Sequence, residues 1–147
     1  GLRLRGPTDF CIGATIDLAR VPLDKEVALA ARKADAGADF FVTQAFFDVS
    51  LPKRFLEAYY AHSGVAFARP IFYGLQVLVQ DGLVFGDLPE STMRELEKGR
   101  SGKEIALEQL HSYIDSGMSG IYLVPPILRG GRRDYEAVMA LLQAFRE

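Results

Sequence analysis

Short apolar runs alternate with longer amphipathic stretches along the chain. The apolar runs predict strands at residues 10–16, 39–47, 69–78 and 120–126. Apolar residues recur at helical spacing in the segments between and after them, and predict helices at residues 25–36, 51–63, 103–116 and 133–145, with a further short helix from residue 89 or 90. Strand and helix thus alternate four times, which is typical of an α/β domain with parallel strands.

Local signals mark where the first two helices begin and end. Asp24 is expected to N-cap the first helix, whose buried face carries Val27 and Ala30. Gly37 and Gly64 follow the last apolar position of the two helices and are natural stops, because glycine readily adopts the left-handed conformation that ends a helix.

The first apolar run, "FCIGATI", contains only apolar and small residues. We expect it to form a strand that is buried on both faces, as in a parallel sheet. Cys11 is then a small buried apolar residue.

Two architectures fit parallel strands joined by right-handed crossovers: an open doubly wound sheet and a β/α barrel. The segment after the first strand, "GATIDLARVP", has one glycine and no GxGxxG, which does not support a Rossmann nucleotide site. Barrel enzymes bind ligands at the carboxyl ends of their strands. Those ends are expected here at residues 15–17, 43–46, 74–76 and 124–127.

Composition narrows the class of protein. The 147 residues, 49% of them hydrophobic, suffice for a single domain over residues 1–147, and the start at Gly1 without a methionine suggests a fragment of a longer chain. A dispersed net charge of −2 argues against a nucleic-acid partner. One cysteine and two histidines argue against a disulfide and a zinc site, and no apolar run approaches the ~20 residues of a membrane span. We therefore expect a cytoplasmic protein without a metal.

The second strand ends in two uncharged hydrogen-bonding residues, Thr43 and Gln44. A glutamine amide offers two donors and an acceptor in one plane, which suits recognition of a heterocyclic amide edge. The alternative is that Gln44 caps strand and loop backbone groups. Phe46 and Phe47 beside it could stack on a flat ligand or belong to the core.

Charged residues near other predicted strand ends also allow two interpretations. Arg32 and Lys33 close the first helix and either complement its dipole or bind a cofactor phosphate. The loop after the last strand carries three arginines and two glycines, at residues 129–133, and suits an anion or simply a solvated turn. Asp17 either orients a ligand or, as we favour, caps a turn.

No acid and base stand at catalytic spacing, so no catalytic residue is assigned.

The segment "RKADAGADFFVTQAFFD", preceded by "IGATID" and followed by "GIYLVPP", resembles the methylenetetrahydrofolate reductase family. The resemblance covers essentially the whole chain and corresponds to the second half of that family's β/α barrel, strands five to eight. The "GIYLVPP" ending is closest to reductase domains fused to homocysteine methyltransferases.

This resemblance implies a flavoprotein of one-carbon metabolism and methionine biosynthesis. In the family, NAD(P)H reduces FAD, which passes hydride to methylenetetrahydrofolate. The Gln that touches the folate substrate carries over to Gln44, and we expect Phe46 beside it to contact substrate as well. FAD-binding positions carry over to Arg32, Lys33 and Val42, with Thr15 in the loop near FAD.

The family's general-acid Glu has no counterpart here, because it belongs to the first half of the barrel. The resemblance thus implies four βα units with parallel strands, half of a TIM-type barrel, that contribute FAD and folate contacts and are inactive alone. The open parallel edges of such a half predict a homo-oligomer or pairing with the missing half. The alternative function is a non-catalytic binding or assembly module that pairs with a partner half-barrel.

Overall fold

The computed structural model describes residue 6 and residues 9–146, so the Gly1-Leu2 start lies outside the described residues. In chain order the elements are β1 (Gly13–Ile16), α1 (Leu23–Asp35), β2 (Phe40–Ala45), α2 (Leu51–Ser63), β3 (Ile71–Gln76), α3 (Glu90–Glu97), α4 (Gly102–Asp115), β4 (Ile121–Val124) and α5 (Tyr135–Arg146). The predicted alternation of strands and helices is confirmed.

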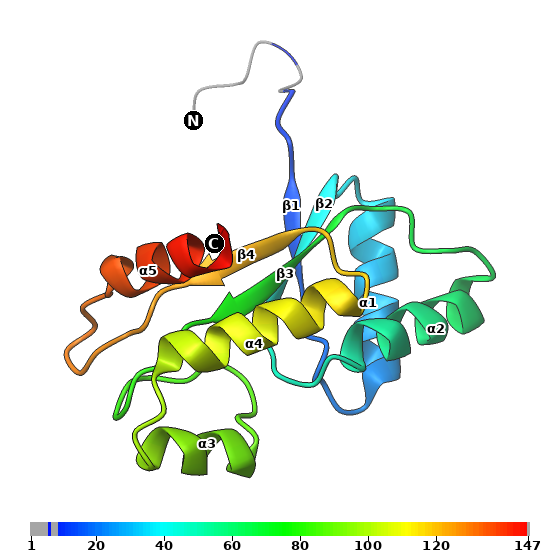
Figure 1. Ribbon diagram of the computed structural model, residues 1–147. Helices are drawn as coiled ribbons and strands as arrows, with labels where there is room; N and C mark the ends of the chain where they lie inside the picture. Colours follow the sequence, from blue (N-terminus) through cyan, green and yellow to red (C-terminus); the bar gives the residue numbers. More distant parts are fainter. Residues whose placement is uncertain (1–5, 7–8, 147) are drawn as a thin grey trace.

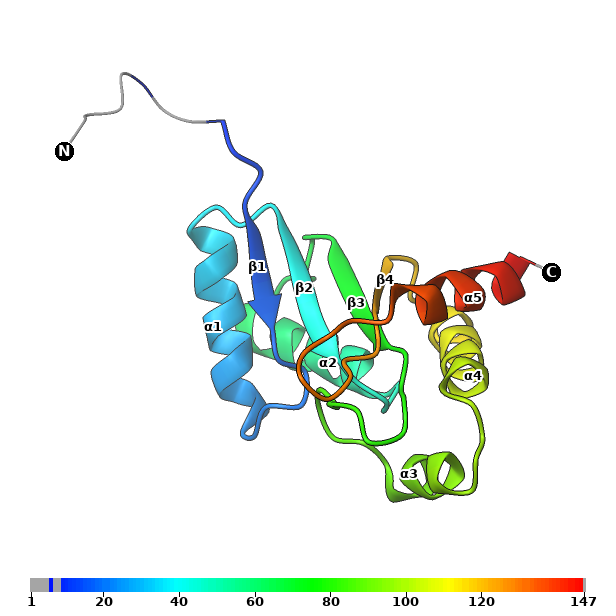
Figure 2. The ribbon, with the colours of Figure 1, turned by 90° about the vertical axis from the view of Figure 1, so that its left-hand side faces the viewer.

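The four strands form one parallel sheet in the order β1-β2-β3-β4, side by side as Figure 2 shows. A doubly wound sheet reverses its strand order part-way, whereas a barrel keeps neighbours in chain order. The sequential order therefore agrees with half of a β/α barrel, one of the two architectures that the strand pattern allows and the one that the family resemblance implies.

The hydrophobic core lies between one face of the sheet and the helices. α1 packs on β1 and α2, while α4 packs on β3 and α5 (Figure 1). Alternate strand residues point into this layer, because side chains along a strand alternate between its faces. The core joins Ile16 of β1, Phe41 of β2 and Leu75 of β3 to helix residues such as Phe55 and Tyr113, all of them at most 1% exposed.

The opposite face of the sheet has no helix over it within the described residues. We call this the open face; it carries the intervening strand side chains, which include Thr15, Phe40, Val42, Phe72 and Tyr122. The rings of Phe40 and Phe72 meet edge to face with centroids 5.7 Å apart. Around them lies an apolar hollow of about 690 Å³. In a complete barrel such side chains would fill the interior.

The expectation for the first strand was wrong in extent and in burial. β1 begins at Gly13, three residues later than predicted, and Cys11 is exposed. The physical reason is that β1 is an edge strand, and one of its faces belongs to the open face. In a complete barrel both faces of such a strand would be covered, which is the environment that its apolar and small residues suit.

The helix-end signals differ in reliability. Gly64 has a φ of 73° and ends α2 as predicted, and Gly37 follows α1 with a φ of 101°. Asp24 is not the N-cap: α1 begins at Leu23, and the cap position is Pro22 without a side-chain hydrogen bond. None of the helices in the described ranges has the length and apolar character needed to span a bilayer.

Candidate functional site

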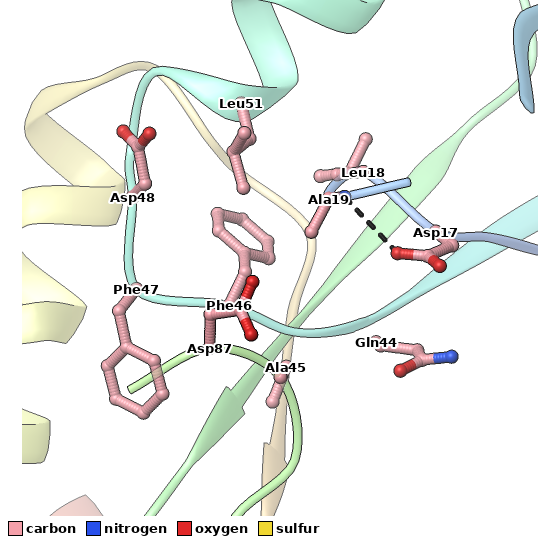
Figure 3. Close-up of a pocket in the computed structure, with 11 residues that line it drawn as sticks. Asp17, Leu18, Ala19, Gln44, Ala45, Phe46, Phe47, Asp48, Leu51 and Asp87 are labelled. Carbon is pink, nitrogen blue, oxygen red and sulfur yellow. Dashed lines mark hydrogen bonds between the residues drawn. The ribbon is translucent and has the colours of Figure 1, made fainter. Parts of the chain in front are cut away.

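Gln44 lies at the carboxyl end of β2, between two hollows. The first, the strand-end hollow, has a volume of about 390 Å³ and is lined by Thr15, Val42, Thr43, Gln44, Ala45, Phe85, Tyr122 and Val124. The second, the loop hollow, has a volume of about 240 Å³ and is lined by Gln44 to Asp48 together with Asp17, Leu18, Ala19, Leu51, Gly86 and Asp87. The Gln44 side chain is exposed and projects from the strand near Asp17 (Figure 3).

Thr43 and Gln44, which the sequence treated as a pair, have different environments. Thr43 is 2% exposed, and its Oγ1 accepts a hydrogen bond from the backbone N–H of Gly74 at 3.0 Å. The pairing of β2 with β3 shifts register here, between Val42 and Ala45. Thr43 thus completes the sheet where the ladder is irregular.

Tyr122, on β4, makes a further hydrogen bond to Thr43. Its hydroxyl donates to the backbone carbonyl of Thr43 at 2.6 Å, reaching across β3. A Cβ on Gly74 would lie 2.7 Å from the Tyr122 hydroxyl oxygen, so only glycine fits beneath the ring. A tyrosine hydroxyl is protonated at neutral pH and can donate, and burial raises the pKa of Tyr122 still further from neutral pH.

Three of the residues expected to bind ligands share the strand-end hollow. Thr15, Val42 and Gln44 come from neighbouring strands β1 and β2, with Thr15 paired to Val42 in the sheet. The wall of this hollow is largely apolar, since Val42, Val124 and the ring of Phe85 contribute to it. A flat, partly apolar ligand with one polar edge suits such a surface.

The other residues expected to bind ligands lie elsewhere. Phe46 is 5% exposed and stacks on Tyr113 with centroids 4.8 Å apart, so it forms part of the core beneath the loop hollow. Arg32 is exposed in the last turn of α1. Lys33, next to it, donates from Nζ to the Thr15 carbonyl at 2.5 Å, on the edge strand β1. The Lys33 ammonium thus contacts the backbone of Thr15, one of the residues that line the strand-end hollow.

The loop hollow contains three carboxylates, and the structure assigns two of them to turns. Asp17 Oδ1 accepts from the Ala19 N–H at 3.2 Å, the dashed contact in Figure 3, which confirms the expected turn cap. Asp48 Oδ1 accepts from the Ser50 N–H at 2.9 Å. Hydrogen bonds from Ser50 lower the pKa of Asp48, so this carboxyl is ionised at neutral pH and unsuited to act as a general acid.

The arginine-rich loop after β4 is folded back on itself. Leu128 accepts a backbone hydrogen bond from Gly131 and donates one to Arg132, and both Gly130 and Gly131 have positive φ angles. Arg129 lies 3.4 Å from Asp81, a contact between two exposed side chains. Arg132 and Arg133 border a separate surface hollow with Asp134 and Glu136, so carboxylates already stand beside these cations.

Sequence reasoning missed two buried polar residues beside the site. Gln76, 3% exposed, donates to the Leu83 carbonyl at 2.7 Å and accepts from the Phe85 N–H at 2.8 Å, which holds Phe85 over the strand-end hollow. Glu26, 2% exposed, accepts from the Asp17 N–H at 3.1 Å and so anchors the loop that borders the loop hollow. A polar residue within an apolar strand was the available signal for Gln76. Glu26 gave none, because a carboxylate in a first helical turn is ordinary.

Comparison with known proteins adds a fold relationship. No protein-family model matches the chain, and no curated protein matches it. Among solved structures, an uncharacterized protein from Clostridium thermocellum that binds two copies of 5-methyl-5,6,7,8-tetrahydrofolic acid has a similar fold, with a TM-score of 0.66 and 20% sequence identity. The match covers 94% of this chain and 54% of that one, so this chain spans about half the length of its structural neighbour. At this identity the likeness shows the shared fold.

Proposed function

We propose that this chain binds a reduced folate at the strand-end hollow, with Gln44 as the principal polar contact. The observation that carries the proposal is the position of Gln44: it is exposed where two hollows meet, while its neighbour Thr43 is used by the sheet. The folate-binding protein of similar fold supports the same ligand class.

The chemistry of the hollow suits a pterin ring. The ring is flat, so it can lie against Val124 and Phe85, and its amide edge presents a donor and an acceptor side by side. The Gln44 amide offers the complementary pair in one plane. A ligand of this kind would be oriented by one side chain and held by apolar contact.

A finer proposal is that the folate site belongs to a flavin-dependent reductase of the methylenetetrahydrofolate reductase type. By the family resemblance Thr15, Val42, Arg32 and Lys33 would hold FAD. Thr15 and Val42 adjoin Gln44, and the Lys33 ammonium lies 2.5 Å from the Thr15 carbonyl, whereas Arg32 lines neither hollow and rests on the resemblance alone. Bound there and reduced by NAD(P)H, the flavin would supply hydride. This chain's residues would bind and orient, and a proton donor would have to come from a completing half-barrel.

Titration with 5-methyltetrahydrofolate, followed by calorimetry, tests the folate proposal. Gln44→Ala should weaken binding roughly 5- to 10-fold, the equivalent of about one lost hydrogen bond, with little change in melting temperature. Gln80→Ala is the matched control, because Gln80 is also exposed but lines neither hollow. Equal affinity for wild type and Gln44→Ala would contradict the assignment, and an unfolded Gln44→Ala would make the residue structural.

Absorbance of the purified protein tests the flavin part separately. A bound flavin gives an absorption band at about 450 nm, and added FAD should produce this band in a protein purified without the cofactor. If the purified protein binds folate but is colourless and does not bind added FAD, the folate-binding proposal stands and the reductase proposal is refuted.

The second candidate function, an assembly module, is favoured by the open face. Phe72 is 41% exposed there, and both β1 and β4 are edge strands of a parallel sheet. Parallel sheets are normally covered on both faces, and unpaired edges promote association. Native mass spectrometry and light scattering should find this chain paired with itself or with a second half-barrel. A well-behaved monomer at high concentration would count against this function.

A further inference from the structure

The backbone at Gln44 is held in place by hydrogen bonds of the preceding residue, Thr43. The backbone carbonyl of Thr43 belongs to the same planar peptide group as the N–H of Gln44. Whatever fixes that carbonyl therefore fixes the direction in which the strand presents Gln44. The Tyr122 hydroxyl does so, with an oxygen–oxygen distance of 2.6 Å.

Gly74 supports the hydrogen bond between Tyr122 and the Thr43 carbonyl in two ways. Gly74, which lacks a side chain, lets the Tyr122 ring cross β3, since a Cβ there would lie 2.9 Å from the ring carbon that bears the hydroxyl. The Gly74 N–H in turn binds Thr43 Oγ1 at 3.0 Å, so one residue of β2 is gripped through both its side chain and its carbonyl. Both bonds occur where β2 shifts register against β3.

Two features suit this contact to a role in the site. The hydroxyl bond links β4 to β2, strands that are not neighbours in the sheet, and the ladder between adjacent strands does not require it. The Tyr122 ring also lines the strand-end hollow beside Val42 and Gln44. One side chain thus contributes to the wall of the hollow and fixes the backbone of the residue expected to read the ligand.

We propose that Tyr122 is the positioning residue of this site, and that its hydroxyl sets the orientation in which Gln44 meets a flat heterocyclic ligand. The proposal rests on the proposed folate function for the identity of the ligand. Its structural part, the control of the Thr43–Gln44 peptide by Tyr122, does not depend on any ligand.

Tyr122→Phe tests the proposal because it removes the hydroxyl and keeps the ring. Affinity for 5-methyltetrahydrofolate should fall roughly 3- to 10-fold, the range expected for one neutral hydrogen bond. Tyr73→Phe is the matched control: Tyr73 is a half-buried tyrosine on the adjacent strand β3 that packs with Phe46 on the helix-covered face. Its loss of a hydroxyl should leave the affinity unchanged.

A double-mutant cycle separates positioning from general support of the fold. If Tyr122 acts through Gln44, adding Tyr122→Phe to Gln44→Ala should weaken binding by less than about twofold further. Independent losses that multiply in the double variant would overturn the proposal. So would wild-type affinity in Tyr122→Phe.

An NMR measurement on the free protein keeps the two proposals distinguishable. The backbone amide nitrogen of Gln44 senses the hydrogen bond to the preceding carbonyl, so its signal should move in Tyr122→Phe and stay in place in Tyr73→Phe. A moved signal in a protein that does not bind folate would retain the positioning role and refute the proposed function. An unmoved signal would refute the positioning role, whatever the folate affinity.

Discussion

Replacing Glu26 by alanine is expected to destabilise the fold more than replacing its exposed ion-pair partner, Arg20, by alanine. Glu26 is 2% exposed and its Oε1 accepts a hydrogen bond from the Asp17 N–H. Its Oε2, also buried, lies 3.0 Å from Arg20 Nη1 without the alignment of a hydrogen bond. The carboxylate thus joins the start of α1 to the loop after β1 through one hydrogen bond and one ion pair.

The two interactions differ in magnitude. A hydrogen bond from a backbone N–H to a buried carboxylate contributes about 1.5–3 kcal/mol. The ion pair adds only about 0.5–1 kcal/mol, because the Arg20 side chain is 44% exposed and remains hydrated. Glu26→Ala should therefore lower the free energy of unfolding by about 2–4 kcal/mol. Arg20→Ala should lower it by about 1 kcal/mol, because truncating this half-exposed side chain opens Glu26 Oε2 to water and does not leave a buried unpaired charge.

Urea unfolding followed by circular dichroism measures both values, and Glu26→Gln serves as the discriminating variant. The amide retains an acceptor for the Asp17 N–H and loses the ion pair, so its cost should resemble that of Arg20→Ala. The reasoning fails if Arg20→Ala costs more than Glu26→Ala, because the ion pair would then dominate. It also fails if Glu26→Ala changes the free energy of unfolding by less than about 0.5 kcal/mol.

Two further predictions concern burial. Burial raises the pKa of Tyr113, Tyr73 and Tyr122 above the ordinary value of 10.0. The stability that these hydroxyls contribute is therefore fully present below pH 10 and is lost as the pH rises toward their folded-state pKa values. The free energy of unfolding, measured from pH 8 to 11, should show this loss, and Tyr113→Phe should make the loss smaller. Cys11, exposed beside the open face, should react with a maleimide in the native protein almost as fast as in urea, whereas a protected thiol in a folded sample would indicate that a partner covers that face.

The local signals in the sequence were reliable where the cause is local. Gly64 stops α2 because only a residue that tolerates a positive φ can end the helix in that way, and this requirement does not depend on the rest of the fold. Asp24 failed as a cap because Pro22 and the loop from Asp17 decide where α1 begins. The burial expected of Cys11 was wrong because this residue precedes β1 and lies beside the open face, and burial depends on the assembled sheet rather than on the local pattern.

The candidate site was predicted in part for the same reason. The strand end at Thr43 and Gln44 was visible, since two polar residues close an apolar run. Phe46 could equally belong to a ligand surface or to the core, and its stacking on Tyr113, 67 residues away in the chain, shows that it is core. Gln76 and Glu26 were missed because their partners lie in loops that the pattern does not place.

The sequence by itself determined the alternation of strands and helices, the approximate position of each and the presence of polar side chains at a strand end, because these follow from local backbone preferences and hydrophobic periodicity. Only the tertiary structure decided the strand order, the open face, and which of the two residues is buried: Thr43 is buried in the sheet and Gln44 is exposed. The bonds that distinguish those two residues join β2 to positions 31 and 79 residues further along the chain. Contacts at such separations exist only once the sheet has formed, and they leave Gln44 free to meet a ligand.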